Sequence, residues 1–199
     1  MITGSEEESR ALMMNAAVQV VAQHGFEGFT TKKWAAQAGV AEGSLYYYFK
    51  SKHELLDETF FMIDHEIADL FSGKLGTAGE PKEFFPYIET HWSRYYNYFM
   101  DNPQKTLYYY RYKNSPRYTD VVSQSEEIYT GVFLQLIKEA EEVLRFADIV
   151  SIDMLRYFIM NVTTGVAYSV VTGIMKHTPE TEQELRGLLM NGLRSLAVT

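Results

Sequence analysis

The chain has 199 residues, of which 46% are apolar and 22% charged, a composition ordinary for a globular protein. It has no cysteine, which excludes disulfide bonds and thiolate metal sites. The formal net charge of −8 argues against indiscriminate binding to nucleic acid. Residues 1–52 nevertheless balance five acidic against five basic side chains, so the whole negative excess lies in residues 53–199. A neutral N-terminal segment followed by an acidic remainder favours a nucleic-acid partner for the N-terminal segment.

The N-terminal fifty residues predict three helices separated by glycines. Apolar side chains recur at helical spacing over Glu6–His24, and Gly25 after them suits a left-handed C-cap. A second helix is predicted from Thr31, its candidate N-cap, to Ala38. A third begins near residues 41–44 and carries a leucine followed by four aromatic side chains. Residues 1–10 contain three consecutive glutamates and no apolar run, so we expect no signal peptide and a cytoplasmic protein.

A glycine turn between the second and third helices is typical of a helix-turn-helix. Gly39 allows the two helices to meet at a sharp angle. In this motif the second helix of the pair lies in the major groove while the first crosses the DNA backbone. Trp34, Leu45 and Phe49 are assigned to the core. The side chains of four consecutive large residues cannot all point inward, so at least one tyrosine is expected at the surface.

Residues 10–56 resemble the DNA-binding head of the TetR family of bacterial regulators. The resemblance implies an all-α fold, with a three-helix helix-turn-helix head over residues 1–52 and a helical ligand-binding and dimerisation body over residues 53–199. It implies a DNA-binding transcription regulator rather than an enzyme, usually a repressor that a small effector releases from a palindromic operator. The residues at matching spacings are Gly25-Phe26, Thr30-Thr31, Ala35, Ala38-Gly39-Val40, Gly43, Leu45-Tyr46, Phe49, Lys52 and Leu55-Leu56.

The resemblance also implies which side chains meet DNA. The start of the second helix faces phosphate, the start of the third lies nearest the base edges, and the lysine that opens a fourth helix binds phosphate. Glu42 departs from the pattern by placing a carboxylate near the groove, where it can accept a hydrogen bond from a cytosine amino group. The residues assigned to DNA are Thr31, Lys32, Glu42, Gly43, Ser44, Tyr46, Tyr47, Tyr48 and Lys52.

Beyond the head, the pattern predicts helices only, and no alternating strand pattern appears. A fourth helix over residues 51–71, capped by Ser51, is expected to link head and body, so that an effector acting on its tilt would change the separation of two heads. A glycine-containing linker follows over residues 72–81. The remaining predicted helices span residues 82–100, 103–112, 118–146, 152–176 and 180–197.

Residues 84–129 are unusually rich in aromatic rings, which suits a pocket for a small apolar or aromatic effector. For any single ring, a place in the core is favoured over contact with an effector. Histidines are scattered without metal-ligand spacing, so no metal and no cofactor are expected. The residues assigned to the effector are Trp92, Tyr95, Phe99, Tyr108, Tyr129, Phe133 and Met160.

The last two predicted helices look like the interface of a homodimer. Gly165, Ser169 and Gly173 recur every fourth residue, and small residues in that register let helices approach closely. Residues 157–175 carry no charge but are too polar along one side for a membrane span, so no membrane partner is expected. The residues assigned to the interface are Val162, Gly165, Val166, Ser169, Gly173, Leu185, Leu189 and Leu193.

Three alternatives stay open at this point. A TetR-like activator, or a regulator that responds to no ligand, would have the same sequence features. A helical enzyme using the aromatic pocket is a remote alternative, because no nucleophile–base pair, metal triad or phosphate loop is visible. A membrane-associated helical protein anchored by residues 157–175 is the third.

Overall fold

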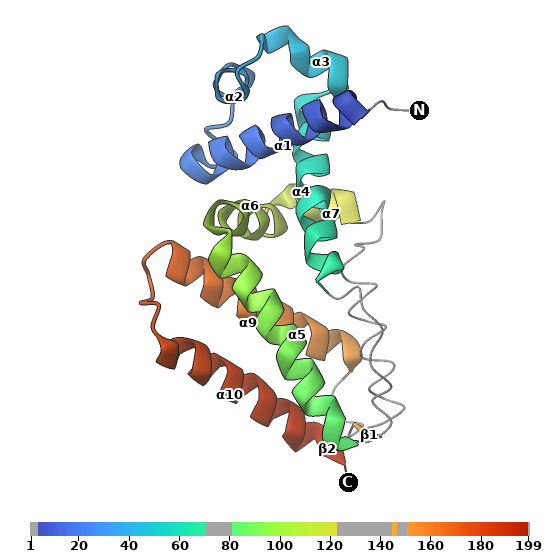
Figure 1. Ribbon diagram of the computed structural model, residues 1–199, viewed down its shortest axis with the longest axis vertical. Helices are drawn as coiled ribbons and strands as arrows, with labels where there is room; N and C mark the ends of the chain where they lie inside the picture. Colours follow the sequence, from blue (N-terminus) through green and yellow to red (C-terminus); the bar gives the residue numbers. More distant parts are fainter. Residues whose placement is uncertain (1–3, 71–80, 123–144, 147–150, 199) are drawn as a thin grey trace. The chain divides into compact units, whose positions relative to one another are not determined.

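The computed structural model describes residues 4–70, 81–122, 145–146 and 151–198. Within these residues the fold is all-α, as predicted, apart from two strands of two residues each (Figure 1). The helices are α1 (Gly4–His24), α2 (Thr31–Ala38), α3 (Leu45–Tyr48), α4 (Lys52–Asp69), α5 (Pro81–Asp101), α6 (Pro103–Lys113), α7 (Pro116–Val122), α9 (Ile152–Val171) and α10 (Pro179–Leu196). A 3₁₀ turn (Glu42–Ser44) precedes α3, and strand β1 (Arg145–Phe146) pairs antiparallel with β2 (Ala197–Val198).

By packing, the chain falls into two compact units. Unit 1 comprises residues 1–64 and 104–125, and unit 2 comprises residues 65–103 and 126–199. Helix α4 continues across the division after Asp64. The boundary that we expect after residue 52, between a DNA-binding head and a ligand-binding body, is a functional one. It differs from this division by packing and stays a prediction.

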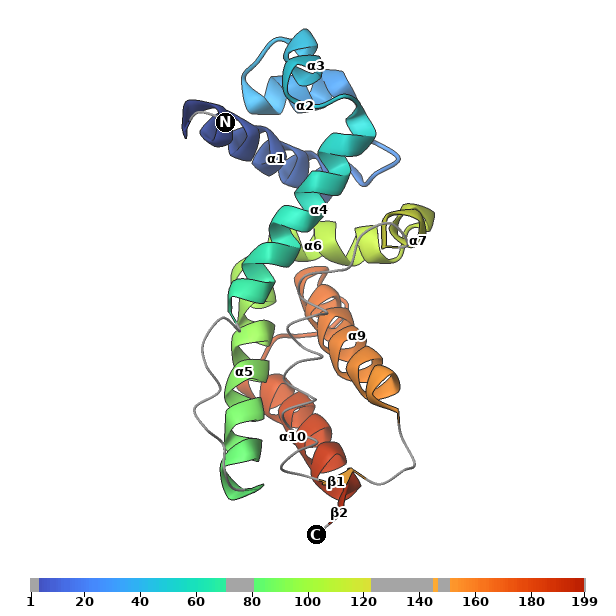
Figure 2. The same cartoon turned by 90° about the vertical axis from the view of Figure 1, so that its right-hand side faces the viewer.

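Unit 1 has a core built where α1 and α2 cross. Trp34 of α2 is fully buried, and its indole Nε1 donates a 2.9 Å hydrogen bond to the carbonyl oxygen of Met13 in α1. Figure 2 shows α1, α2 and α3 gathered around the first turns of α4. The buried apolar faces of α1 and α4 supply most of the remaining core: Met13, Ala16, Ala17, Val20, Val21, Leu55, Leu56, Phe60 and Ile63.

The two turns that shape the head are closed by glycine. Gly25 ends α1 at φ 68° and Gly39 ends α2 at φ 69°, both in the left-handed region that glycine enters without steric cost. The N-cap of α2 is Thr30, not Thr31 as predicted: Thr30 is extended, and its hydroxyl accepts from the backbone N–H of Lys33. The prediction failed because two adjacent threonines offer the same capping group, and only the backbone angles decide between them.

Unit 2 is centred on α5, which packs against α9 and α10. The indole Nε1 of Trp92 donates a 3.0 Å hydrogen bond to the hydroxyl of Thr163 on α9. Glu89 of α5 meets two arginines of α10, with N–O distances of 3.5 Å to Arg186 and 4.0 Å to Arg194. Aromatic and polar contacts therefore fasten α5 to both neighbours.

Several predicted boundaries need correction. The helix expected over residues 51–71 ends at Asp69, and the one expected over residues 152–176 ends at Val171. Gly173 stops the latter by adopting a φ of 76°, so it lies beyond the helix and outside the predicted stripe of small residues. The helix expected over residues 118–146 is described only as far as Val122, and its predicted end at residues 145–146 is a strand. Residues 123–144 and most of the predicted linker lie outside the described residues.

Within the described ranges, no helix is both long and apolar enough to cross a membrane. Helix α9 contains Asp153, Arg156 and Asn161, together with two threonines and a serine, and these polar residues lower its mean hydropathy.

Candidate nucleic-acid interface

The third helix is a single turn that divides its side chains between the core and solvent. Leu45 is fully buried and Phe49, just after the helix, is 2% exposed. Tyr46 and Tyr47 between them are 66% and 78% exposed. The assignments of Leu45 and Phe49 to the core and of at least one tyrosine to the surface are thus confirmed. Large rings exposed next to a buried pair are a candidate surface for contact with a partner molecule.

The other residues assigned to DNA surround these tyrosines in sequence and are accessible to different degrees. Tyr48 is half-buried, and its ring lies 4.8 Å from that of Tyr47 in an edge-on arrangement. Lys32 and Gly43 are exposed. The ammonium group of Lys52 lies 6.0 Å from the centre of the Phe29 ring, so the lysine opens α4 with its stem over the core. Ser44 is half-buried.

Glu42 is held by the start of α2. The hydroxyl of Thr31 donates a hydrogen bond to the Glu42 carboxylate, which joins the first residue of α2 to the 3₁₀ turn before α3. Both residues were assigned to DNA, and the structure brings them together. The carboxylate thus engages a neighbouring hydroxyl within the head, which reduces its freedom to approach a base.

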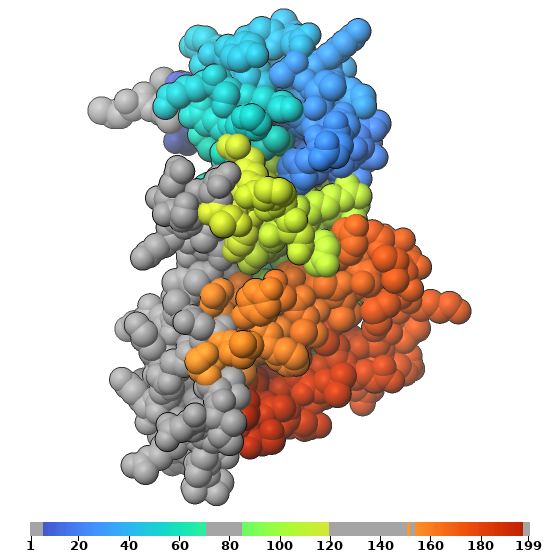
Figure 3. Space-filling view, turned by 180° about the vertical axis from the view of Figure 1, so that it is seen from behind, coloured from blue at the N-terminus to red at the C-terminus, as the bar shows by residue number. Residues whose placement is uncertain are grey.

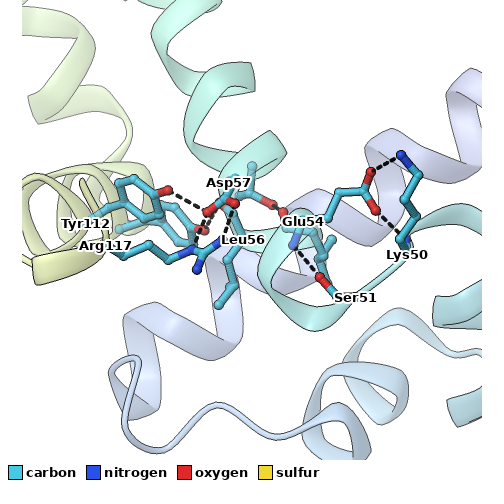
Figure 4. A network of polar contacts seen from close by, with 10 residues as sticks. Lys50, Ser51, Glu54, Leu56, Asp57, Tyr112 and Arg117 are labelled. Carbon is cyan, nitrogen blue, oxygen red and sulfur yellow. Dashed lines mark hydrogen bonds and ion pairs between the residues drawn. The ribbon is translucent and has the colours of Figure 1, made fainter. Parts of the chain in front are cut away.

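The start of α4 is fixed by a reciprocal cap, which Figure 4 shows at its right. The hydroxyl of Ser51 accepts from the backbone N–H of Glu54 at 3.0 Å, confirming Ser51 as the predicted cap. The Glu54 carboxylate in turn accepts from the backbone N–H of Lys50 and lies 3.8 Å from its ammonium group. These bonds satisfy N–H groups that the first turn of a helix leaves free.

Asp57, one turn further along α4, holds helices α6 and α7 (Figure 4). Its carboxylate accepts a 2.6 Å hydrogen bond from the hydroxyl of Tyr112 in α6 and pairs through both oxygens with the guanidinium of Arg117 in α7. Beside it, the hydroxyl of Tyr108 donates to the carbonyl of Leu56 at 2.6 Å. Burial, together with the Asp57 acceptor, raises the pKa of Tyr112 well above its usual range, so this phenol stays a donor.

Helix α6 also contacts the end of α1. The guanidinium of Arg111 donates to the carbonyls of Val21 at 2.6 Å and Ala22 at 3.1 Å, in the last turn of α1. The Val21 carbonyl also accepts from the backbone N–H of Gly25 at 2.8 Å. The ring of Phe26 packs edge-on against those of Tyr108 and Tyr112 at 5.2 and 5.9 Å. Helices α6 and α7 are therefore an integral part of unit 1.

A short helix with exposed tyrosines, joined through a glycine turn to a preceding helix and buttressed by α1 and α4, defines a helix-turn-helix DNA-binding protein. Residues 13–59 match the family model described as bacterial regulatory proteins, tetR family. An HTH-type transcriptional regulator of Haemophilus influenzae is 25% identical over 129 residues, which are 64% of this chain and 67% of that protein. The fatty acid metabolism regulator protein of Bacillus subtilis is 44% identical over 48 residues, about a quarter of each chain.

The likeness of fold extends beyond the head. The crystal structure of the transcriptional regulator FadR from Bacillus subtilis, solved in complex with stearoyl-CoA, superposes with a TM-score of 0.75 and 16% identity, and the match covers 92% of this chain and 98% of that one. In the sequence of its head and in its fold, the chain resembles the TetR family of bacterial transcription regulators. It is a DNA-binding regulator, and its relatives are regulators rather than enzymes.

The residues assigned to an effector fall into three groups. Trp92, Tyr95, Phe99 and Met160 are all buried in unit 2. Tyr108 belongs to unit 1, where its ring packs against Phe26 and its hydroxyl donates to the carbonyl of Leu56. Tyr129 and Phe133 lie outside the described residues. Among the described residues, no three histidine, aspartate or glutamate side chains gather as a metal site would require.

The residues assigned to a dimer interface lie on α9 and α10, whose atoms adjoin in Figure 3. Leu185, Leu189 and Leu193 are buried within the subunit, whereas Val162, Gly165, Val166 and Ser169 are half-buried. Helices α9 and α10 also line an apolar hollow of about 270 Å³. The residues around it are Leu155, Phe158, Ile159, Leu189, Gly192, Leu193, Ser195 and Leu196.

Several surface and bridging residues escaped the sequence analysis. Tyr157 and Phe158 of α9 are 61% and 54% exposed, and Leu188 of α10 is 75% exposed. Their helical spacing was visible, but spacing does not tell which side of a helix meets the rest of the subunit. Asp57 and Arg117, 60 residues apart in the chain, left no signal at all.

Proposed function

We propose that this regulator is a homodimeric repressor that binds a palindromic operator through α3 and releases it when a small apolar effector binds. The observation that carries the proposal is the exposure of Tyr46 and Tyr47, 66% and 78%, on a one-turn helix whose other side is locked in the core. As a DNA-binding protein it would act in the cytoplasm.

The exposed tyrosines suit the contacts of a major groove. Tyr47, the more exposed, would contact base edges, with Glu42, Gly43 and Ser44 at the same end of the helix. Tyr46, Tyr48 and Lys52 would contact phosphate or sugar, as would Thr31 and Lys32 at the start of α2. Because the remainder of the chain is acidic, only this face can approach DNA closely.

Two copies would associate through α9 and α10. Tyr157 and Phe158 of α9 and Leu188 of α10 expose large apolar side chains, and α9 also carries the half-buried Gly165 and Ser169. Two such helices from each subunit make a four-helix bundle. Two-fold symmetry would present two copies of α3 to half-sites about 34–36 Å apart or a multiple of that spacing.

The effector would be apolar and small. The interior of unit 2 is lined with aromatic rings, and the buried hydroxyl of Tyr96 has no hydrogen-bond partner within the described part of the chain, which leaves a polar group for a ligand. The likeness to a regulator that binds stearoyl-CoA makes long-chain acyl-CoA esters the first probes.

Selection from random duplexes tests the operator. Wild-type protein is expected to enrich a palindrome, and Tyr47→Ala to weaken its binding by about 1–3 kcal/mol per half-site through lost base contact. Lys52→Ala should weaken all duplexes alike and lower the slope of log K against log salt by about one per head. Tyr47→Phe is the matched control, because it keeps the ring.

Two outcomes would count against the proposal. An enriched sequence without two-fold symmetry would contradict the dimeric reading, and enrichment of no sequence at any salt would contradict sequence-specific binding. Expression of a reporter behind the selected operator distinguishes a repressor from an activator.

Asp57 offers a test of the switch. The Asp57→Asn variant keeps the shape but removes the charge that holds Arg117, so α6 and α7 are less firmly tied to α4. We expect stearoyl-CoA to weaken operator binding by the 5–150-fold typical of allosteric coupling in wild type, and by much less in Asp57→Asn. Operator affinity is measured with and without the ester. The control is Glu54→Gln, on the same helix, whose side chain contacts Lys50 and not α6 or α7 in the bonds described above. If stearoyl-CoA weakened operator binding by the same factor in Asp57→Asn as in wild type, a role of Asp57 in the switch would be contradicted.

A further inference from the structure

The recognition helix α3, Leu45–Tyr48, is too short to hold its own conformation. Isolated helices below about 12 residues are marginal in water, because a first turn costs more entropy than its one hydrogen bond returns. Leu45 and Phe49 anchor one side of α3 in the core. The direction of so short a helix therefore depends on the contacts made at its ends.

Arg10 of α1 supplies such a contact. Phe49 is extended, at φ −135° and ψ 134°, so α3 ends at Tyr48 and the Tyr48 carbonyl has no helical donor. The Nη1 group of Arg10 donates to this carbonyl. The same guanidinium lies 4.5 Å from the centre of the Phe49 ring, within the range of a cation–π contact.

The other arm of Arg10 reaches α4. Its Nη2 group donates to the carboxylate of Glu58, and the two side chains are 21% and 36% exposed. A pair this accessible adds little to stability by itself. Its value is geometric, because the planar guanidinium fork engages the carbonyl, the ring and the carboxylate in one orientation.

We propose that Arg10 is a positioning residue for DNA recognition: it fixes the end of α3 to α1 and α4, and so sets the angle at which Tyr46 and Tyr47 meet the operator. Arg10 does not itself contact phosphate. This inference rests on the proposed role of α3. Arg10 is the only lysine or arginine before Lys32, and a phosphate contact would be the simplest reading of its charge, but both arms of its guanidinium are engaged within the head.

The test compares Arg10→Ala and Arg10→Lys with wild type on the selected operator and on an unrelated duplex, over a range of salt. We expect Arg10→Ala to lose about tenfold in operator affinity, as for one charge-assisted hydrogen bond, while its affinity for the unrelated duplex and its salt slope stay unchanged. Arg10→Lys should restore little, because an ammonium lacks the fork. Asn15→Ala, an exposed residue of α1 bonded within its own helix, should bind like wild type.

Glu58→Gln tests the same contact from the side of α4, without a substitution in α1. It should lose part of the operator affinity, and the double variant with Arg10→Ala should lose less than the sum of the two. An equal loss on both duplexes with a salt slope lower by about one per head would make Arg10 a phosphate contact and overturn the proposal. Equal losses of affinity for both duplexes together with a lowered Tm, or no loss of operator affinity in Arg10→Ala, would overturn the proposal too. If the wild type selects no operator, the proposed function fails instead.

Discussion

Trp34→Ala is expected to unfold the DNA-binding head. The side chain is fully buried between α1 and α2, and truncating a buried tryptophan costs about 3–5 kcal/mol through lost contacts and the cavity left behind. The hydrogen bond from its Nε1 to the Met13 carbonyl is lost as well. Since whole domains are stable by only about 5–15 kcal/mol, such a loss removes a large part of the margin.

The two tryptophans of the chain make the measurement specific, because Trp34 lies in unit 1 and Trp92 in unit 2. Urea unfolding followed by circular dichroism should show the loss, while Trp92 fluorescence in Trp34→Ala reports unit 2 alone. Trp34→Phe is the matched control: it keeps most of the ring, loses the N–H donor, and should be clearly less destabilised. A loss below about 1 kcal/mol in Trp34→Ala would contradict the central packing role of this residue.

Phe60→Ala is expected to be almost as damaging, at about 3–5 kcal/mol. Phe60 is fully buried on α4, and its ring stacks on those of Tyr112 at 4.5 Å and Tyr109 at 5.2 Å, both from α6. Stacked pairs add to the area that they bury. The substitution therefore loosens α6 from α4 as well as opening a cavity in unit 1.

Fluorescence of Trp34 in a Trp92→Phe background reports whether α6 folds together with the head. In Phe60→Ala the Trp34 transition should move to lower urea. Phe61→Ala is the control, because Phe61 is half-buried and should shift the transition less. If the Trp34 transition stayed in place while helical signal was lost, α6 would not belong to the cooperative unit of the head.

These effects follow from helices that meet across long stretches of chain. Tyr108, Tyr112 and Arg117 reach Leu56 and Asp57 from more than 50 residues away. Tyr108 was predicted to contact the effector together with Trp92 and Phe99, because all three are aromatic residues in one segment. Composition places rings in a segment but does not tell which ring packs against which helix. The structure assigns Tyr108 to unit 1 and the other two rings to unit 2.

Local features were the ones that the sequence predicted well. The helices over residues 31–38, 103–113 and 179–196 lie within one or two residues of their expected limits, because caps, glycines and prolines act over a single turn. Gly25 was expected to be a left-handed cap and is, and Gly39 ends α2 as expected. The errors at Thr30 and Gly173 are also local. The first arose because two adjacent threonines offer the same capping group, and the second because a glycine suits both a close helix contact and the end of a helix.

By itself, the sequence determined the all-α fold class, the helix-turn-helix over residues 31–49 and the resemblance of the head to the TetR family, because hydrophobic period, turn glycines and motif spacing are properties of adjacent residues. Only the tertiary structure decided that Arg10 braces α3 and that Asp57 receives α6 and α7. It likewise decided which side chains of α9 and α10 remain exposed. The physical reason is that a charged pair or a buried face is defined by its partner, and the partner is brought into contact only when distant segments pack together.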